Sequence, residues 1–233
     1  GPFKFSGDAV WKGQQRELRI ATAAGDADGA LRFKATARTK VAAGAPAGPS
    51  AQFEGSIVDL AAKARIEGNL AMLLPLPELP AAVTPAPTPQ AGDKATAAAT
   101  VKPAGPVALD IKSKLDVDAR RLDAADIVAS IENVGQPQLA SGTASLAWGQ
   151  PPQLEFNASA RWLDFDRLSP SSGRASPAET LAAMARGLVA VLPEQTTVRG
   201  GIGIEQITLG GEAVSALDIA VKRDASGPLL IER

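Results

Sequence analysis

The chain has 233 residues, of which 45% are hydrophobic, so it has enough apolar material to bury the core of one large β domain or two smaller ones. Its 24 basic and 25 acidic residues are scattered and leave a formal net charge of −1, which argues against a nucleic-acid partner because binding phosphates requires a basic surface. The absence of His, Cys and Tyr excludes thiolate chemistry and imidazole or thiolate metal ligands, and we expect no catalytic residue, metal or cofactor.

The N-terminal part of the chain is expected to form strands. Residues 3–11 predict the first one, and a weaker alternation of apolar and polar residues marks 17–22 and 31–36. The Gly- and Asp-rich segment 25–29 between the last two is typical of a turn.

The alternation stops in a stretch rich in Ala, Pro and Thr. Residues 73–106 contain eight prolines and four charged residues. Because proline does not donate a hydrogen bond to a β-ladder and the stretch has little to bury, its sequence predicts a long loop or linker within a single β-rich domain covering 1–233.

The clearest strands follow this stretch. In 109–118, every odd position holds an apolar residue or the small Ser113, and every even position holds a charged residue. The same alternation appears in 154–162 and 215–222, and it indicates antiparallel strands with one face in water. Between Ile204 and Ile207 the phase of the alternation slips, which predicts a β-bulge or bend. The residues predicted to share the apolar face, as core or lipid contacts, are Ile111, Leu115, Val117, Leu154, Phe156, Ile202, Ile204, Leu217, Ile219 and Val221.

One helix is expected, over residues 177–192. Ser176 can cap it, Pro177 suits its first position, and Glu179 completes a capping box. Apolar residues then recur three or four positions apart until Pro193 ends the helix, so its apolar stripe should pack on the sheet. The fold class is therefore mainly β, an antiparallel curled sheet or groove of meandering strands with one helix.

Two carboxylates are candidates for chemistry. Asp116 and Asp118 point to one face of a strand, about 7 Å apart, a spacing that suits calcium or an acid and base pair. Because basic residues are interleaved with them, a solvated strand face is the favoured interpretation. The tryptophans lie at the ends of strands, where packing at the rim of the sheet is favoured over a stacking platform for sugars.

The C-terminal part also resembles a known family. Ala-Arg-Arg-Leu-Asp at 119–123 recurs 41 positions later as Ala-Arg-Trp-Leu-Asp at 160–164, an echo that indicates a repetitive build. Residues 142–168, which include Gly-Thr-Ala-Ser-Leu-Ala-Trp-Gly-Gln-Pro-Pro, together with 200–209 and 217–233, resemble the AsmA-like envelope proteins of Gram-negative bacteria.

The resemblance implies a non-catalytic periplasmic segment of a larger protein, held in the inner membrane by an anchor outside this chain. It also implies a β-groove related to repeating lipid-transfer proteins, with a part in outer-membrane biogenesis or phospholipid transport. The Pro-rich stretch 73–106 departs from the family pattern. Two functions stay open: a groove that shelters phospholipid acyl chains, and a structural β domain with a closed core that binds other envelope proteins.

Overall fold

The computed structural model describes residues 2–11, 13–23, 29–41, 48–59, 63–75, 108–131, 137–164, 195–209, 212–225 and 227–232. Strands make up 80% of them, which confirms the mainly β prediction, and these ranges contain no helix. The helix predicted over 177–192 lies outside the described residues. So does the predicted loop, except for 73–75, which are not loop but the end of a strand.

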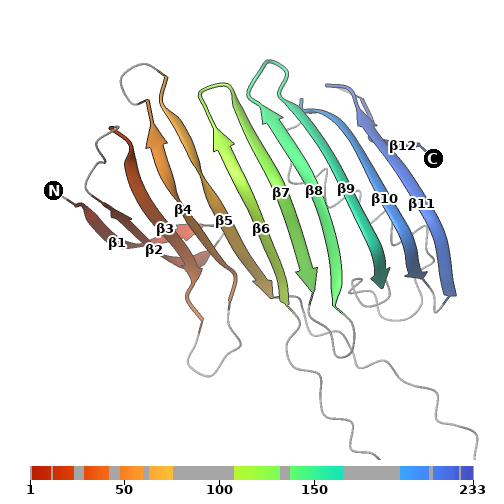
Figure 1. Cartoon of the computed structure of the whole chain (residues 1–233), viewed down its shortest axis with the longest axis horizontal. Helices are drawn as coiled ribbons and strands as arrows, with labels where there is room; N and C mark the ends of the chain where they lie inside the picture. The colour runs from red at the N-terminus through yellow and green to blue at the C-terminus, as the bar shows by residue number, and fades with distance from the viewer. Residues whose placement is uncertain are drawn as a thin grey trace, which may run out of the picture.

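One twelve-stranded sheet contains all the strands of the described residues, arranged side by side in chain order and not closed into a barrel (Figure 1). The strands are β1 (Lys4–Trp11), β2 (Gln14–Thr22), β3 (Leu31–Thr39), β4 (Ser50–Val58), β5 (Arg65–Pro75), β6 (Ala108–Val117), β7 (Arg121–Ile131), β8 (Gln138–Ala147), β9 (Gln153–Asp164), β10 (Thr197–Leu209), β11 (Glu212–Arg223) and β12 (Leu230–Glu232).

Neighbouring strands are antiparallel, as predicted, with one exception. β9 and β10 are parallel, with Leu154 opposite Val198 and Ala158 opposite Ile202. Parallel neighbours need a crossover connection rather than a tight turn, and residues 165–194, which join these two strands, lie outside the described ranges.

The strand register places apolar side chains in continuous rows across the sheet. Because side chains alternate between the two faces of a strand, residues that are paired in the ladder share a face. Following the partners from β3 to β10 gives one such row: Leu31, Ile57, Ile66, Val117, Leu122, Leu146, Leu154 and Val198. We call the side of the sheet that carries this row the apolar face, and the other side the polar face.

Phenylalanine rings cover glycines on the apolar face. A Cβ added to Gly200 would lie 2.4 Å from the ring of Phe156, and one added to Gly68 would lie 2.6 Å from the ring of Phe53. The ring of Phe53 also packs against that of Phe33, with centroids 5.3 Å apart. The glycines therefore leave room for large side chains on neighbouring strands.

Two irregularities bend the ladder. Between Ala124 and Ile127 the register of β7 shifts by one residue, and Asp126 has a positive φ of 49°. In β10, Glu205 interrupts the pairing, and Ile204 and Ile207 on either side of it are both buried. The partners of β10 keep the same register on both sides of Glu205, so the predicted bulge does not appear as a register shift.

Candidate functional site

The apolar face is the candidate binding surface of the sheet. The register places on it every residue predicted for the apolar set: Val117 and Leu154 in the row defined above, Leu115, Phe156 and Val221 in the next, then Ile202 and Ile219, and finally Ile111, Ile204 and Leu217. The residues predicted from the sequence therefore lie on one surface of the sheet.

Burial of the apolar face changes from one end of the sheet to the other. Towards β11, Val198 and Ile204 are only 0% and 4% exposed. Towards β1, Phe5 is 45% exposed and its cross-strand partner Ile20 is 38% exposed. The same face is thus closed at one end and accessible to solvent at the other.

The strands between these ends carry half-buried apolar residues. From Ile20, the ladder continues through Ala35 on β3 and Phe53 on β4 to Leu70 on β5. Since all described strands belong to one sheet, these side chains pack on their lateral neighbours rather than on a second sheet.

Buried polar groups border the closed end of the apolar face. The Nε of Arg223 donates a hydrogen bond to the carbonyl oxygen of Thr196, at 2.9 Å. At the opposite ends of the strands, the Oε1 of Gln138 accepts one from the backbone N–H of Asp164, at 2.8 Å. All four residues are buried, so these bonds fix the ends of β8 to β11.

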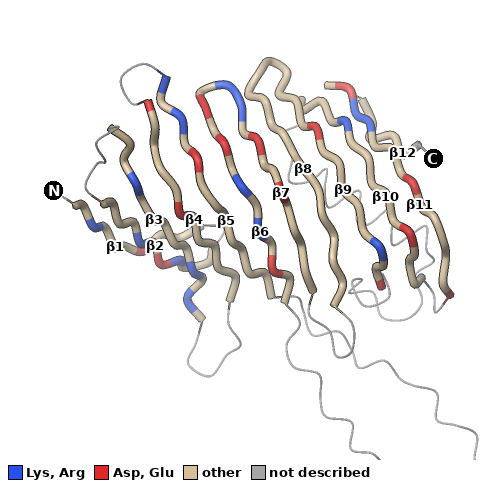
Figure 2. The backbone as a smooth tube through the Cα atoms, viewed as in Figure 1, with Lys and Arg blue, Asp and Glu red and all other residues tan. Residues whose placement is uncertain are grey.

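The polar face carries charges of both signs. Figure 2 shows basic and acidic residues interspersed along β5, β6 and β7 rather than gathered by sign. The Nζ of Lys114 lies 2.7 Å from the Oδ2 of Asp126, and this hydrogen bond raises the pKa of the lysine. Such exposed pairs contribute little to stability.

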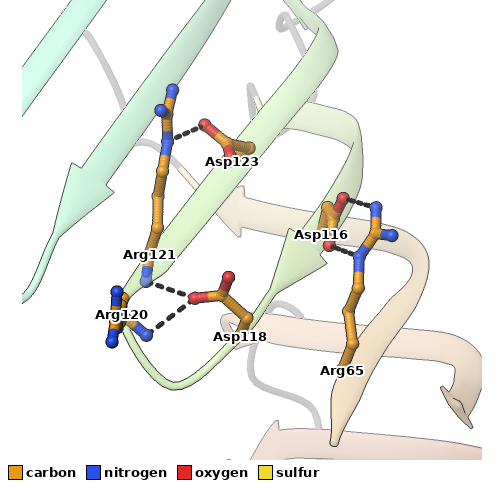
Figure 3. A network of polar contacts seen from close by, with 6 residues as sticks. All are labelled: Arg65, Asp116, Asp118, Arg120, Arg121 and Asp123. Carbon is orange, nitrogen blue, oxygen red and sulfur yellow. Dashed lines mark hydrogen bonds and ion pairs between the residues drawn. The ribbon is translucent and has the colours of Figure 1, made fainter. Parts of the chain in front are cut away.

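The carboxylates singled out in the sequence make structural contacts (Figure 3). Arg65 binds Asp116 through two hydrogen bonds, which lower the pKa of that carboxyl. Asp118 accepts hydrogen bonds from the backbone N–H groups of Arg120 and Arg121, both at 2.7 Å, and these lower its pKa. Asp118 therefore holds the turn between β6 and β7, and Asp116 ties that hairpin to β5.

Metal ligands do not cluster in the part of the chain that the structure describes: no group of three or more Asp or Glu side chains there has a geometry that would hold an ion. Trp148 lies at the end of β8, where its backbone N–H bonds the carbonyl oxygen of Arg120 at 2.8 Å. The indole Nε1–H donates a long hydrogen bond to the carbonyl oxygen of Asp118, at 3.4 Å, and the residue is 45% exposed, so Trp148 lies at the rim of the sheet without being packed into it.

No helix within the described ranges has the length and apolar character needed to cross a bilayer. Comparisons of the chain with models of protein families, with curated proteins and with solved structures find no match.

Proposed function

We propose that this chain is a non-catalytic periplasmic β segment whose apolar face shelters phospholipid acyl chains, in outer-membrane biogenesis or phospholipid transport. The observation that carries the proposal is the apolar face itself, which continues across the strands of a single sheet and is accessible at the β1 end. The resemblance of residues 142–168, 200–209 and 217–233 to AsmA-like envelope proteins supplies the lipid class and the compartment.

The energetics of such a surface suit reversible binding. Burying hydrocarbon is worth about 0.8 kcal/mol per methylene, so an acyl chain of about sixteen carbons with half of its surface covered gains about 6 kcal/mol. That gain corresponds to a Kd between millimolar and micromolar. A ligand held this way can leave again, and its capture needs no specific chemistry beyond an apolar row.

The test combines lipid analysis with uptake of an uncharged fluorescent acyl ester. We expect purified protein to yield extractable phospholipid and to bind the ester. Replacing Ile20 by Gln should lower ester affinity several-fold with little change in Tm, because Ile20 is more than a third exposed and its replacement leaves a polar group on the accessible row.

Arg19→Gln is the matched control, since Arg19 is the preceding residue, lies on the polar face and pairs with Glu17. Its ester affinity should equal that of the wild type. Protein that contains no lipid and binds no ester would overturn the proposal.

A second candidate function is a structural β domain that binds envelope partners and contains no lipid. The buried cluster of Ala160, Ile204 and Ile207 favours it, because these residues form a packed core at one end of the sheet. Under this alternative the interior is filled by side chains and the protein binds no lipid. Substitutions on the apolar face would then alter stability alone.

A further inference from the structure

β1 forms one edge of the sheet, and β2 is the only described strand that pairs with it (Figure 1). The carbonyl oxygen of Phe3, directly before β1, accepts a hydrogen bond from the N–H of Thr22 on β2, at 2.8 Å. Backbone groups alternate in direction along a strand, so the odd-numbered residues of β1 direct theirs to β2. The even-numbered residues direct theirs outwards, where a further strand can bind: Lys4, Ser6, Asp8 and Val10.

This edge lacks the features that usually prevent two sheets from pairing. Edge strands are commonly short, bulged or interrupted by proline, or they carry a charge that points to the buried side. β1 has eight residues in unbroken register with β2 and contains no proline. Its two charged residues, Lys4 and Asp8, lie on the polar face. Phe5 on the apolar face is 45% exposed, so pairing at this edge would also cover apolar surface.

The charges of β1 select one register for two copies of the strand. In an antiparallel pair related by a twofold axis, residues whose backbone groups point outwards lie opposite each other. With the axis at Ser6, Lys4 of each copy lies opposite Asp8 of the other, and the axis produces this pair twice. An axis at Lys4 or at Asp8 would bring like charges together, and an axis at Phe5 or Gly7 forms no pair of opposite charges.

Both charged side chains are available for this contact. Lys4 is exposed and has no ion pair within the described part of the chain. Asp8 is bound by the Nζ of Lys40 at 2.7 Å and by the Nε2 of Gln15 at 3.4 Å, but both reach its Oδ2. The Oδ1 of Asp8 can therefore accept a second cation.

The same register suits the apolar face. It places Phe5 of each copy opposite Gly7 of the other, and pairs of this kind already occur inside the sheet, where Phe33 lies opposite Gly55 and Phe156 opposite Gly200. A glycine leaves room for a ring on the neighbouring strand, as the 2.4 Å between the Phe156 ring and a Cβ added to Gly200 illustrates.

We infer that two copies of this chain associate through β1, in an antiparallel pair centred on Ser6 that joins their sheets edge to edge. Side chains keep their faces across such a pair, so the two apolar faces become continuous and their accessible ends meet at the axis. The inference goes beyond the proposed function and does not depend on lipid. The alternatives are a monomer and a head-to-tail contact of β1 with β11 of another copy, which would grow into open chains instead of stopping at a dimer.

The first test is sedimentation velocity of the whole chain over a range of concentrations. We expect a reversible dimer with a Kd of about 1–100 µM, because the interface is confined to one strand from each copy. Ser6→Pro removes an outward N–H at the axis and should abolish the dimer, whereas Ser6→Ala keeps that N–H and should dimerise like the wild type. Neither substitution removes a hydrogen bond to β2, so Tm should change little and reports that each variant is folded.

The second test addresses the register through charge. Lys4→Glu and Asp8→Lys each place like charges opposite each other twice, so each variant alone should dimerise about tenfold more weakly than the wild type. In an equimolar mixture of the two variants, position 4 of each copy carries the charge opposite to that of position 8 of its partner, and the wild-type affinity should return. Lys63→Glu, at an exposed lysine between β4 and β5, is the matched control and should leave the Kd unchanged.

Four results would overturn the inference. These are a chain that stays monomeric up to about 500 µM, a dimer that survives Ser6→Pro, growth beyond a dimer, and a mixture of the charge variants that associates no better than its components. Lipid extraction and ester binding are measured separately, so failure of the dimer and failure of the proposed function are distinguishable.

Discussion

Gly55 on β4 offers the sharpest test of the packing between strands. It is paired with Gly68 on β5, and a Cβ added to it would lie 2.1 Å from the carbonyl oxygen of Glu67 and 2.8 Å from the Cα of Gly68. These are backbone atoms, which have no rotamer to change, so Gly55→Ala has to push β4 and β5 apart. Overpacking of this kind costs 1–3 kcal/mol, and a backbone clash belongs at the upper end, about 3 kcal/mol.

For a chain of this size, about 3 kcal/mol lowers Tm by about 6–12 °C, which thermal unfolding followed by far-UV circular dichroism measures directly. Gly201→Ala is the matched control. There the nearest atom to an added Cβ is the Oδ1 of Asn157, at 3.3 Å, and that side chain can move. We expect the control to lie within about 1 kcal/mol of the wild type, since alanine also restricts the unfolded chain. Equal effects of the two substitutions would refute the close approach of β4 and β5.

Two further predictions concern the faces of the sheet and the β6–β7 turn. Phe156→Asp should destabilise the fold by about 3 kcal/mol in urea unfolding, because it places an unpaired charge on the apolar face. Asn157→Asp, one residue further and exposed on the other face, should cost less than about 1 kcal/mol, and equal losses would contradict the register. The folded pKa of Asp118 is lowered, so its contribution to stability is present above its unfolded pKa of about 3.9 and is lost as pH falls through the folded value. Asp118→Asn should therefore lose less Tm than the wild type between pH 5 and pH 2, and an equally steep loss would contradict the role of this carboxyl in the turn.

Period-two alternation in the sequence predicted which face of a strand each residue occupies, but it did not predict which strands lie side by side. The run 109–118 became β6 with its lysines exposed and its odd positions turned to the other side, as the pattern requires. The parallel pairing of β9 and β10 left no mark in the sequence, because alternation states which face a residue occupies and not which strand lies beside it.

Proline and aspartate account for two local differences from the expected structure. The prolines after Leu73 predicted a loop, yet β5 runs to Pro75, where a residue without an N–H is tolerated because the ladder ends there. The bulge in β7 was missed because its signal is one aspartate in the left-handed region, a conformation that Asp adopts more readily than most residues.

The sequence predicted which residues belong to the apolar face, but it did not predict how exposed each of them is. Ile20 and Ile204 are both isoleucines in alternating strands on the same face, but one is more than a third exposed and the other is buried. The difference follows the position of each strand in the folded sheet, β2 near one edge and β10 further in at the other end, which no local pattern encodes.

Burial of the apolar face changes along the sheet, so one end of the sheet can serve structural packing while the other end binds lipid. A closed domain would bury the face evenly, whereas here the packed cluster of Ala160, Ile204 and Ile207 is confined to the β9 and β10 strands, and Phe5 and Ile20 remain accessible at β1 and β2. A rigid packed end can fix the shape of the sheet, while the accessible end keeps apolar area available to a ligand. Polar substitutions at the packed end should therefore act through stability, and those at the accessible end through lipid binding.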